Sequence, residues 1–438
     1  MSLNPTTANA PTIGFAGLTH LGLNMAAASA ARGFEVIGFH NDADLVKAIS
    51  TGDLPVSEPG LADLINNVSD QLTFTAEVDA LRCCDMVYIS VDVPTNDHGE
   101  SDLAPIRAII TQVEENLAPD ALLVVLCQVP PGFTRTLGRD PKTTYYQVET
   151  LIFGRAIERA MNPERFILGC GDPNSPVDPR LAAHLTAFNC PILPMRYESA
   201  ELAKISINMC LVASIGVANT MAEICENVGA DWSEITPALR LDARIGPKSY
   251  IAPGLGLAGG NLERDLETVI RLADVHGTDA GIVHAWNANS RHRKDWCFQI
   301  LQDEVLASNP GATIGLLGLA YKEDTHSTKN APSLMLLSHL DPSRITAYDP
   351  VVRAGDIDPA LKSAADPMAC CEGAQAVIII TPWPQYRDLD PAEIARRMAG
   401  RTLIDPYGLL DCTEVTMAGL DHFTLGRGPV RAKGRTND

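Results

Sequence analysis

Short apolar runs alternate with helix-like segments over the first 170 residues. The runs lie at residues 12–16, 35–39, 86–90, 121–126 and 166–168, and a helix rich in small residues is expected at 23–31. Strands that are separated by helices of this length predict a parallel, doubly wound sheet.

A long helix and a second alternating series follow. The pattern from Glu198 to about Val228 predicts one helix that ends at Gly229. Strand-like runs then resume at 313–317, 345–348, 376–380 and 402–404. The predicted fold class is α/β, with two Rossmann-like doubly wound parallel-sheet domains joined by a long central helix. The predicted domain segments are 1–197, 198–307 and 308–438.

Composition and charge narrow the possible partners. The chain has 438 residues, of which 46% are hydrophobic and 20% charged, as in an ordinary globular protein. A net charge of -20 argues against nucleic acid or an anionic membrane as a partner. The uncharged stretch between Lys204 and Glu223 is just long enough to span a bilayer, but polar residues interrupt it. We therefore expect a buried helix between domains and no membrane.

The cysteines and the N-terminus indicate a cytoplasmic protein. The eleven cysteines are scattered without C-x-x-C spacing, which is typical of reduced thiols and predicts no metal site. Met1-Ser-Leu-Asn has no basic region before an apolar run, so no signal peptide is expected.

The segment Gly17-Leu-Thr-His-Leu-Gly22 occupies the first strand-to-helix turn. Dinucleotide-binding folds place G-x-G-x-x-G here, so that the backbone approaches a pyrophosphate at the helix N-terminus. Gly17, Thr19, His20, Leu21 and Gly22 are therefore candidate cofactor residues. Thr19 replaces the second glycine and narrows this approach, and a domain that keeps the fold without binding a dinucleotide is the alternative.

Several segments carry a family resemblance. The stretch Tyr250-Ile-Ala-Pro-Gly-Leu-Gly-Leu-Ala-Gly-Gly-Asn-Leu-Glu-Arg-Asp265 resembles the active-site loop of UDP-glucose/GDP-mannose 6-dehydrogenases, usually P-G-x-x-x-G-G-S-C-x-x-K-D. Further matches lie, in family order, at 53–61, 93–95, 199–204, 318–322 and 348–350. The resemblance implies an N-terminal NAD-binding domain, a central dimerisation and active-site domain, a C-terminal nucleotide-sugar domain and a homodimer.

Asn261 departs from the family pattern at the position of the nucleophilic cysteine. In the family that cysteine attacks a bound aldehyde to form a thiohemiacetal, which permits a second oxidation to the acid. An amide cannot form this adduct. The framework therefore indicates a nucleotide-sugar dehydrogenase whose usual reaction cannot finish in the usual way.

The resemblance also implies cofactor contacts. His40 stands where the family usually has an aspartate that binds the adenosine ribose of NAD, and Asn41 could substitute there. A protonated histidine would tolerate a 2′-phosphate, so NAD is favoured while NADP stays open; a solvated loop residue is the other interpretation of His40. The remaining implied contacts are Pro94, Thr95, Gln128 and Lys329.

The implied catalytic residues lie in three segments. Lys204 and Asn208 are one helical turn apart and share a face, and in the family they hold the oxyanion and an ordered water. Asp265 matches the partner carboxylate. Glu149 is kept in the loop 147–154, but Phe153 replaces the second glutamate of that loop.

Nucleotide-phosphate contacts are implied by position, and cationic side chains among them would neutralise a diphosphate. The implied substrate-binding residues are Leu151, Arg244, Tyr250, Gly254, Lys322 and Arg401.

Three functions fit these residues. The first is an NAD(P)-dependent oxidoreductase that acts on a nucleotide sugar or a related nucleoside and leaves the product at the aldehyde or ketone level. The second is an epimerase or dehydratase that uses tightly bound NAD for a transient oxidation. The third is a catalytically silent binding subunit, against which the retained Lys204, Asn208, Glu149 and Asp265 argue.

Overall fold

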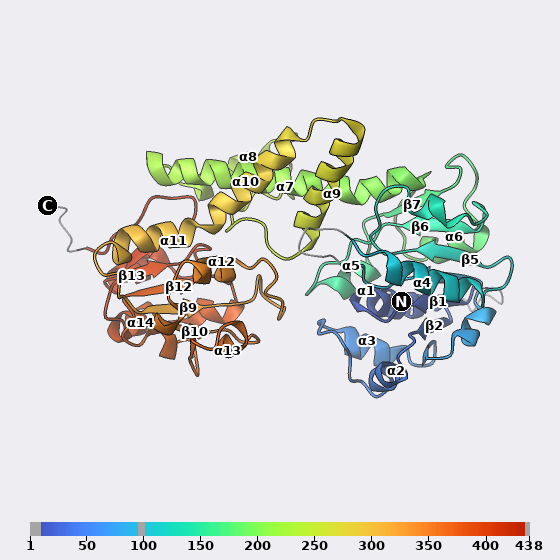
Figure 1. The fold of residues 1–438 in the computed structure, drawn as a ribbon, viewed down its shortest axis with the longest axis horizontal. Coiled ribbons are helices and arrows are strands. Elements are labelled where there is room, and N and C mark those ends of the chain that lie inside the picture. The colour runs from blue at the N-terminus through green and yellow to red at the C-terminus, as the bar shows by residue number, and fades with distance from the viewer. Residues whose placement is uncertain (1–9, 95–100, 434–438) are drawn as a thin grey trace. The chain divides into compact units, whose positions relative to one another are not determined.

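The computed structural model describes residues 10–94 and 101–433 and divides into two compact units. The first unit is Met1–Ile207 and the second is Asn208–Asp438. The boundary lies inside the long helix α7, Tyr197–Val228, so one continuous helix contributes residues to both units (Figure 1).

An eight-stranded sheet forms the centre of the first unit. Its order is β3-β2-β1-β4-β5-β6-β7-β8, and every neighbouring pair is parallel except β6 with β7. The first six positions follow the strand order of a dinucleotide-binding sheet. The strands are β1 Ile13–Ala16, β2 Val36–Phe39, β3 Leu72–Thr75, β4 Met86–Ile89, β5 Leu122–Val125, β6 Thr144–Gln147, β7 Phe166–Cys170 and β8 Ile192–Arg196.

Helices cover both faces of this sheet, which is why its central strands are apolar at successive positions. Phe15 and Tyr88 pack with α1, α3 and α6, whereas Val87 and Leu123 face the opposite way and pack with α4. The helices are α1 His20–Ala31, α2 Ala43–Ser50, α3 Leu61–Asn67, α4 Ala104–Glu114, α5 Ala156–Met161 and α6 Pro179–Thr186, with 3-10 turns at Val78–Cys83 and Thr134–Leu137.

Helix α7 ends before Gly229, whose φ of +76° is the left-handed conformation that terminates many helices. By length and composition alone α7 could cross a membrane, but the core helix of a soluble protein passes the same test. Only 33% of its apolar window is buried within this chain. The expectation that this helix is buried is therefore met only in part.

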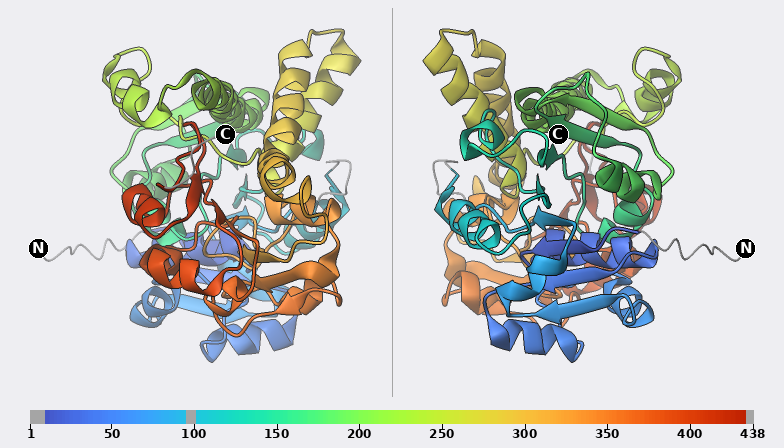
Figure 2. Two further views of the ribbon diagram at one scale, coloured as in Figure 1. Left: turned by 90° about the vertical axis from the view of Figure 1, so that its left-hand side faces the viewer. Right: turned by 90° about the vertical axis from the view of Figure 1, so that its right-hand side faces the viewer.

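The second half of α7 packs against two other helices of the second unit. Helices α9 and α10 lie side by side, and α7 contributes Val212 to their shared apolar cluster (Figure 2). Further along α7, Glu226 accepts hydrogen bonds from the buried Arg293, from the Trp296 indole and from the Gly426 backbone. The helices are α8 Trp232–Leu241, α9 Asn261–His276, α10 Gly281–Lys294 and α11 Trp296–Leu301, followed by a π-helical turn at Gln302–Leu306.

A second, six-stranded sheet is parallel throughout, with the order β11-β10-β9-β12-β13-β14. Its strands are β9 Ile314–Leu317, β10 Ile345–Tyr348, β11 Lys362–Ser363, β12 Ala376–Ile379, β13 Thr402–Ile404 and β14 Asp421–Phe423. Its helices are α12 Pro332–Ser338, α13 Ala354–Ile357, α14 Pro391–Arg397 and α15 Cys412–Met417, with 3-10 turns at Pro342–Arg344, Ala369–Cys371 and Pro384–Asp388.

Asp349 closes the first turn of this second sheet. Its carboxylate accepts hydrogen bonds from the backbone N–H groups of Leu319 and Ala320 at 2.7 and 3.1 Å, and from the Trp383 indole at 3.0 Å. In a dinucleotide-binding fold the amides of this turn face the pyrophosphate. The second sheet therefore keeps the Rossmann-like topology. In its first turn, however, the backbone amides donate to the Asp349 carboxylate and are not available to a pyrophosphate.

The predicted fold class is confirmed, with local corrections. The predicted helix at 23–31 begins earlier, at His20, directly after the glycine turn. The first sheet is not wholly parallel, because β7 runs antiparallel to β6.

Candidate functional site

The turn between β1 and α1 is packed so closely that its two glycines have no room for a β-carbon. Gly17 has φ of +115°, and a β-carbon there would lie 2.7 Å from the Val91 backbone nitrogen. A β-carbon on Gly22 would lie 1.8 Å from the Gly17 carbonyl oxygen, so only glycine lets α1 start this close to β1. The Thr19 hydroxyl donates to the Ser90 carbonyl oxygen at 3.0 Å, away from the start of the helix.

The N-terminus of α1 fits an anionic pyrophosphate. Thr19 is the N-cap residue, and within the described residues no side chain caps this helix. The first-turn N–H groups of His20, Leu21 and Gly22 have no carbonyl partner inside a helix. No side chain therefore competes for them with a bound phosphate, which the helix dipole also favours.

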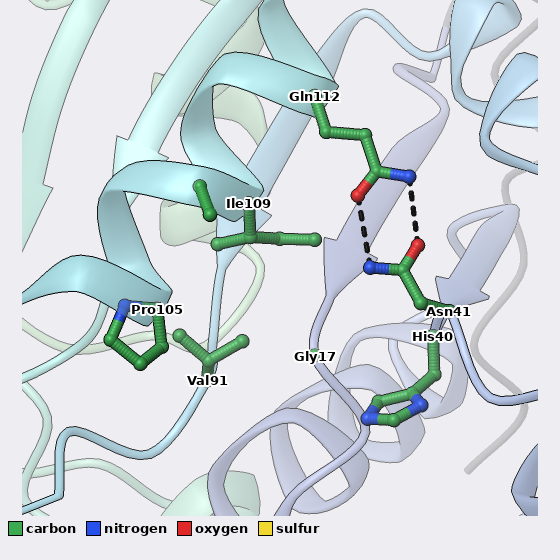
Figure 3. Close-up of a pocket in the computed structure, with 8 residues that line it drawn as sticks. Gly17, His40, Asn41, Val91, Pro105, Ile109 and Gln112 are labelled. Carbon is green, nitrogen blue, oxygen red and sulfur yellow. Dashed lines mark hydrogen bonds between the residues drawn. The ribbon is translucent and has the colours of Figure 1, made fainter.

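A pocket of about 190 Å³ lies beside this turn (Figure 3). Asn41, after β2, exchanges two hydrogen bonds with Gln112 of α4, at 2.9 and 2.8 Å. His40 Nδ1 accepts a hydrogen bond from the Asp42 backbone N–H at 3.1 Å. The lining residues are Gly17, His40, Asn41, Val91, Pro105, Ala108, Ile109 and Gln112. The structure thus brings His40 and Asn41 together with Gly17, as a ribose-binding role requires.

Glu58 links the start of α1 to the loop before α5, a role that the sequence analysis did not predict. Its buried carboxylate lies 2.9 Å from His20 Nε2 and accepts hydrogen bonds from the backbone N–H groups of Gly154 and Ala156 at 3.0 and 2.7 Å. The Phe153 ring stacks on the His20 ring with centroids 4.1 Å apart. Glu58 therefore fixes the loop before α5 against the start of α1. Its place in the family-like segment 53–61 was the available signal.

The remaining cofactor candidates of the first unit are on loops. Pro94 is exposed and its carbonyl oxygen accepts from the Asp102 backbone N–H at 2.8 Å. Thr95 lies outside the described residues. Gln128 is partly buried directly after Cys127. The structure places Pro94 after β4 and Gln128 after β5, on the same edge of the sheet as Gly17.

Lys204 on α7 contacts Glu149 of the loop after β6. Its ammonium donates to the Glu149 carbonyl oxygen at 3.0 Å and lies 3.7 Å from Glu149 Oε2. The other carboxylate oxygen, Oε1, accepts from the Leu151 backbone N–H. Two of the predicted catalytic residues, Lys204 and Glu149, therefore meet in the first unit, and both side chains are largely buried.

Asp265 is the most buried carboxylate among the catalytic candidates, with 1% of its surface exposed. Asn208 Nδ2 donates to Asp265 Oδ2 at 2.6 Å, and the Arg264 guanidinium lies 3.6 Å from Oδ1. Asn261 is the first residue of α9, one turn before Asp265 and on the same face. The Asn261 amide at the helix start thus lies one turn from a buried carboxylate that is paired with an amide and a guanidinium.

Lys329, from the segment between β9 and α12, packs against the glycine loop that precedes Asn261. A β-carbon on Gly260 would lie 3.4–3.5 Å from the end of the Lys329 side chain, and the Gly259 N–H donates to the Lys329 carbonyl oxygen at 3.0 Å. Glu263, in the first turn of α9, pairs with Lys294 at 3.0 Å and with Asn330. Lys329 therefore places a positive charge next to the residue that precedes Asn261.

The predicted nucleotide-binding residues do not all lie together at one site. Arg244 forms a two-point pair with Asp242 of its own exposed loop, at 3.0 and 2.7 Å. Tyr250 is 58% exposed. The Gly254 N–H donates to Asn219 of α7 at 2.8 Å.

Lys322 and Arg401 lie at opposite edges of the second sheet. Lys322 follows the carboxyl end of β9, the edge at which open α/β sheets bind ligands. Arg401 precedes β13, so it lies at the amino-terminal edge, where it pairs with the buried Asp421 at 3.3 Å. The structure does not bring these two cations together around one phosphate.

All eleven cysteines lie in the described part of the chain and are free thiols. Cys210 comes two residues after Asn208 on α7, so it faces the opposite side of that helix. Burial raises the pKa of Cys297 and of Cys127, and the Cys127 thiol donates to the Ile89 carbonyl oxygen at 3.1 Å. None of these three thiols is a candidate nucleophile.

The glycine turn, the uncapped α1 and the Rossmann-like sheets define a dinucleotide-binding protein. Family models match residues 11–181 (UDP-glucose/GDP-mannose dehydrogenase family, NAD binding domain), 198–291 (central domain) and 315–412 (UDP binding domain). This chain belongs to the UDP-glucose/GDP-mannose dehydrogenase family, a family of NAD-dependent nucleotide-sugar dehydrogenases that act on CH–OH groups.

Individual relatives match over nearly the whole chain. UDP-glucose 6-dehydrogenase TuaD of Bacillus subtilis is 30% identical over 437 residues, which cover 95% of this chain and 93% of the relative. UDP-glucose 6-dehydrogenase of Pseudomonas aeruginosa is 29% identical, covering 94% and 96%. The structure of a UDP-glucose dehydrogenase from Pyrobaculum islandicum shares the fold, with a TM-score of 0.82 at 24% identity and coverage of 98% and 100%.

NAD is the cofactor of this protein, as predicted. The residues present fit it, because the Gly17 and Gly22 positions exclude a β-carbon and the start of α1 offers amides to the pyrophosphate. When bound, NAD supplies the hydride acceptor for oxidation of a CH–OH group.

Proposed function

We propose that this protein oxidises an alcohol carbon of a nucleotide sugar, or of a related nucleoside, once, and leaves the product at the aldehyde or ketone level. The observation that carries the proposal is Asn261 at the first position of α9, one turn from the Asn208–Asp265 pair. Nucleotide sugars are the substrate class because the relatives are named UDP-glucose 6-dehydrogenases.

The retained residues suffice for one oxidation. The alcohol must lose a hydride from carbon and a proton from oxygen, and Asp265 can accept the proton directly or through a water held by Asn208. Lys204 has three N–H donors, of which the Glu149 carbonyl takes one, so the ammonium can also stabilise a developing alkoxide. Neither step requires a thiol.

A second oxidation requires an oxygen or sulfur nucleophile on the aldehyde carbon. The amide of Asn261 is not nucleophilic in this sense, because its nitrogen lone pair is delocalised into the carbonyl. The aldehyde formed in the first step therefore lacks the covalent route that a cysteine gives. Hydration by water is the route that remains, and it would appear as a second NADH; we propose that the reaction stops at the aldehyde or ketone instead.

The stoichiometry of the reaction tests this proposal. With NAD and a panel of nucleotide sugars and nucleosides, we expect one NADH for each substrate consumed, and a product two hydrogens lighter that hydroxylamine traps as an oxime. Two NADH with a uronic acid would contradict the proposal. Product without net NADH would indicate the epimerase or dehydratase instead, and no turnover of any substrate in the panel would indicate a silent subunit.

We also propose that the chain is a homodimer built on α7. Val217, Met221, Ile224 and Val228 follow one another at helical spacing, and between 40% and 68% of each is exposed. An apolar stripe of this length on a charged protein is typical of a subunit interface. Light scattering at micromolar concentration should give the mass of a dimer or of a higher even oligomer, and a monomer mass would contradict this assignment.

A further inference from the structure

The adenosine end of the cofactor pocket is built from uncharged groups. We propose that this protein binds NADP about as tightly as NAD, because His40 stands in place of the acid that normally selects against a 2′-phosphate and the neutral Asn41–Gln112 amide pair lines the pocket beside it. The inference rests on the dinucleotide binding assumed in the proposed function and adds its cofactor selectivity.

An acid at the end of β2 selects NAD in two ways. Its carboxylate accepts hydrogen bonds from the ribose hydroxyls, and its charge repels the 2′-phosphate of NADP. The repulsion supplies most of the discrimination, because two negative groups in contact inside a protein cleft interact strongly. A pocket without this charge loses the larger part of its selectivity.

The Asn41–Gln112 pair can serve either ribose. Each amide uses one N–H and one oxygen lone pair in the reciprocal hydrogen bonds of 2.9 and 2.8 Å (Figure 3). Each amide therefore keeps a second N–H and a second lone pair. The lone pairs can accept from a 2′-hydroxyl, and the N–H groups can donate to a 2′-phosphate.

His40 contributes a donor to the same pocket. Its Nδ1 accepts from the Asp42 backbone N–H at 3.1 Å, so a neutral ring carries its proton on Nε2. A ring N–H is a poor substitute for a carboxylate as the partner of ribose hydroxyls, but it can donate to a phosphate oxygen. His40 therefore adds no selection for NAD.

The nearest acid in the sequence is committed elsewhere. Asp42 Oδ1 caps α2 by accepting from the backbone N–H groups of Asp44 and Leu45 at 2.9 and 3.1 Å. The eight described residues that line the pocket include no Asp or Glu, and they include no Lys or Arg either. These lining residues thus provide neither a negative charge that would repel the 2′-phosphate of NADP nor a positive charge that would attract it.

Direct binding measurements test the inference without turnover. The full-length protein, freed of bound nucleotide, would be titrated with NAD and with NADP by calorimetry, and with 5′-AMP and adenosine 2′,5′-bisphosphate to isolate the adenosine end. We expect the two dinucleotide Kd values to agree within about tenfold. A preference of more than tenfold in either direction would overturn the inference.

Two variants restore a carboxylate to the pocket from opposite sides. Asn41→Asp and Gln112→Glu should each weaken NADP at least about tenfold through repulsion of the phosphate, while NAD changes only a few-fold. Asn66→Asp, on the exposed surface of α3, makes the same charge change outside the pocket and should leave both affinities unaltered. Equal weakening of NAD and NADP in both pocket variants, with unchanged melting temperatures, would contradict the role given to the pair.

The outcomes separate this inference from the proposed function. Binding of NAD alone would overturn the inference that NADP binds equally well, but it would not contradict the proposal of a single oxidation. Binding of neither dinucleotide would overturn both. Two NADH per substrate would overturn the single oxidation without bearing on the Kd ratio.

Discussion

Replacing Asp265 by asparagine is expected to lower kcat by about 10²- to 10⁴-fold, the range found for loss of a general base. Asparagine has the same shape and can keep the hydrogen bond to Asn208, but it cannot take a proton from the substrate hydroxyl. The rate of NADH formation at saturating substrate gives kcat, and NAD titration shows whether the cofactor still binds.

The control for this variant lies on the same helix. Asp274 is exposed on α9, so Asp274→Asn makes the same change of charge away from the site. It should leave kcat within about twofold, as surface substitutions usually do. Arg264 is largely buried beside Asp265 and loses its charge partner in the variant, so the melting temperature must be followed. A folded Asp265→Asn protein with an unchanged kcat would assign Asp265 a structural role only.

The two sheets could be predicted because their central strands are buried on both faces. Such strands appear in sequence as continuous apolar runs, and β5, Leu122–Val125, is fully buried. Edge strands gave no such signal. In β8, Pro194 interrupts the run and Leu193 is 41% exposed. In β14 the acid Asp421 is buried, which is possible because Arg401 pairs with it.

The sequence could name candidate members of the site, but it could not predict which of them contact one another. The resemblance selected Lys204, Glu149 and Asp265, and the helical spacing placed Lys204 and Asn208 on one face. Contacts between distant segments have no sequence signal: Asn41 and Gln112 are 71 residues apart and come from different elements. The resemblance implied that Arg401 binds the nucleotide, but Arg401 comes directly before β13 and so lies at the amino-terminal edge of the sheet. Ligands of open α/β sheets bind at the opposite, carboxyl edge.

The position of Asn261 also shows what a cysteine would gain there. The first residue of α9 lies at the positive end of the helix dipole, and within the described residues no side chain caps this helix. A thiol at a helix N-terminus has a lowered pKa, because the dipole stabilises the thiolate. The fold therefore still provides the electrostatic setting for a nucleophile that the chain lacks.

Asn261→Cys is accordingly expected to change the product. NADH formed per substrate should rise above one, with some uronic acid and a thiohemiacetal or thioester mass on the peptide that contains residue 261. The gain in rate should be weak, because Phe153 stands where the family has a second glutamate and Thr19 stands where the cofactor turn usually has a glycine. Misplacement of reacting groups by about 1 Å can cost roughly 10²-fold.

Asn261→Ser is the matched control, since serine is similar in size to cysteine but its hydroxyl is not ionised at neutral pH and is a much weaker nucleophile than a thiolate. It should keep the wild-type ratio of one NADH per substrate. If Asn261→Cys also keeps that ratio while it is folded and active in the first oxidation, residue 261 is not what blocks the acid-forming step. The carboxylate lost at Phe153 would then be the next position to restore, and Phe153→Glu combined with Asn261→Cys should raise the ratio toward two.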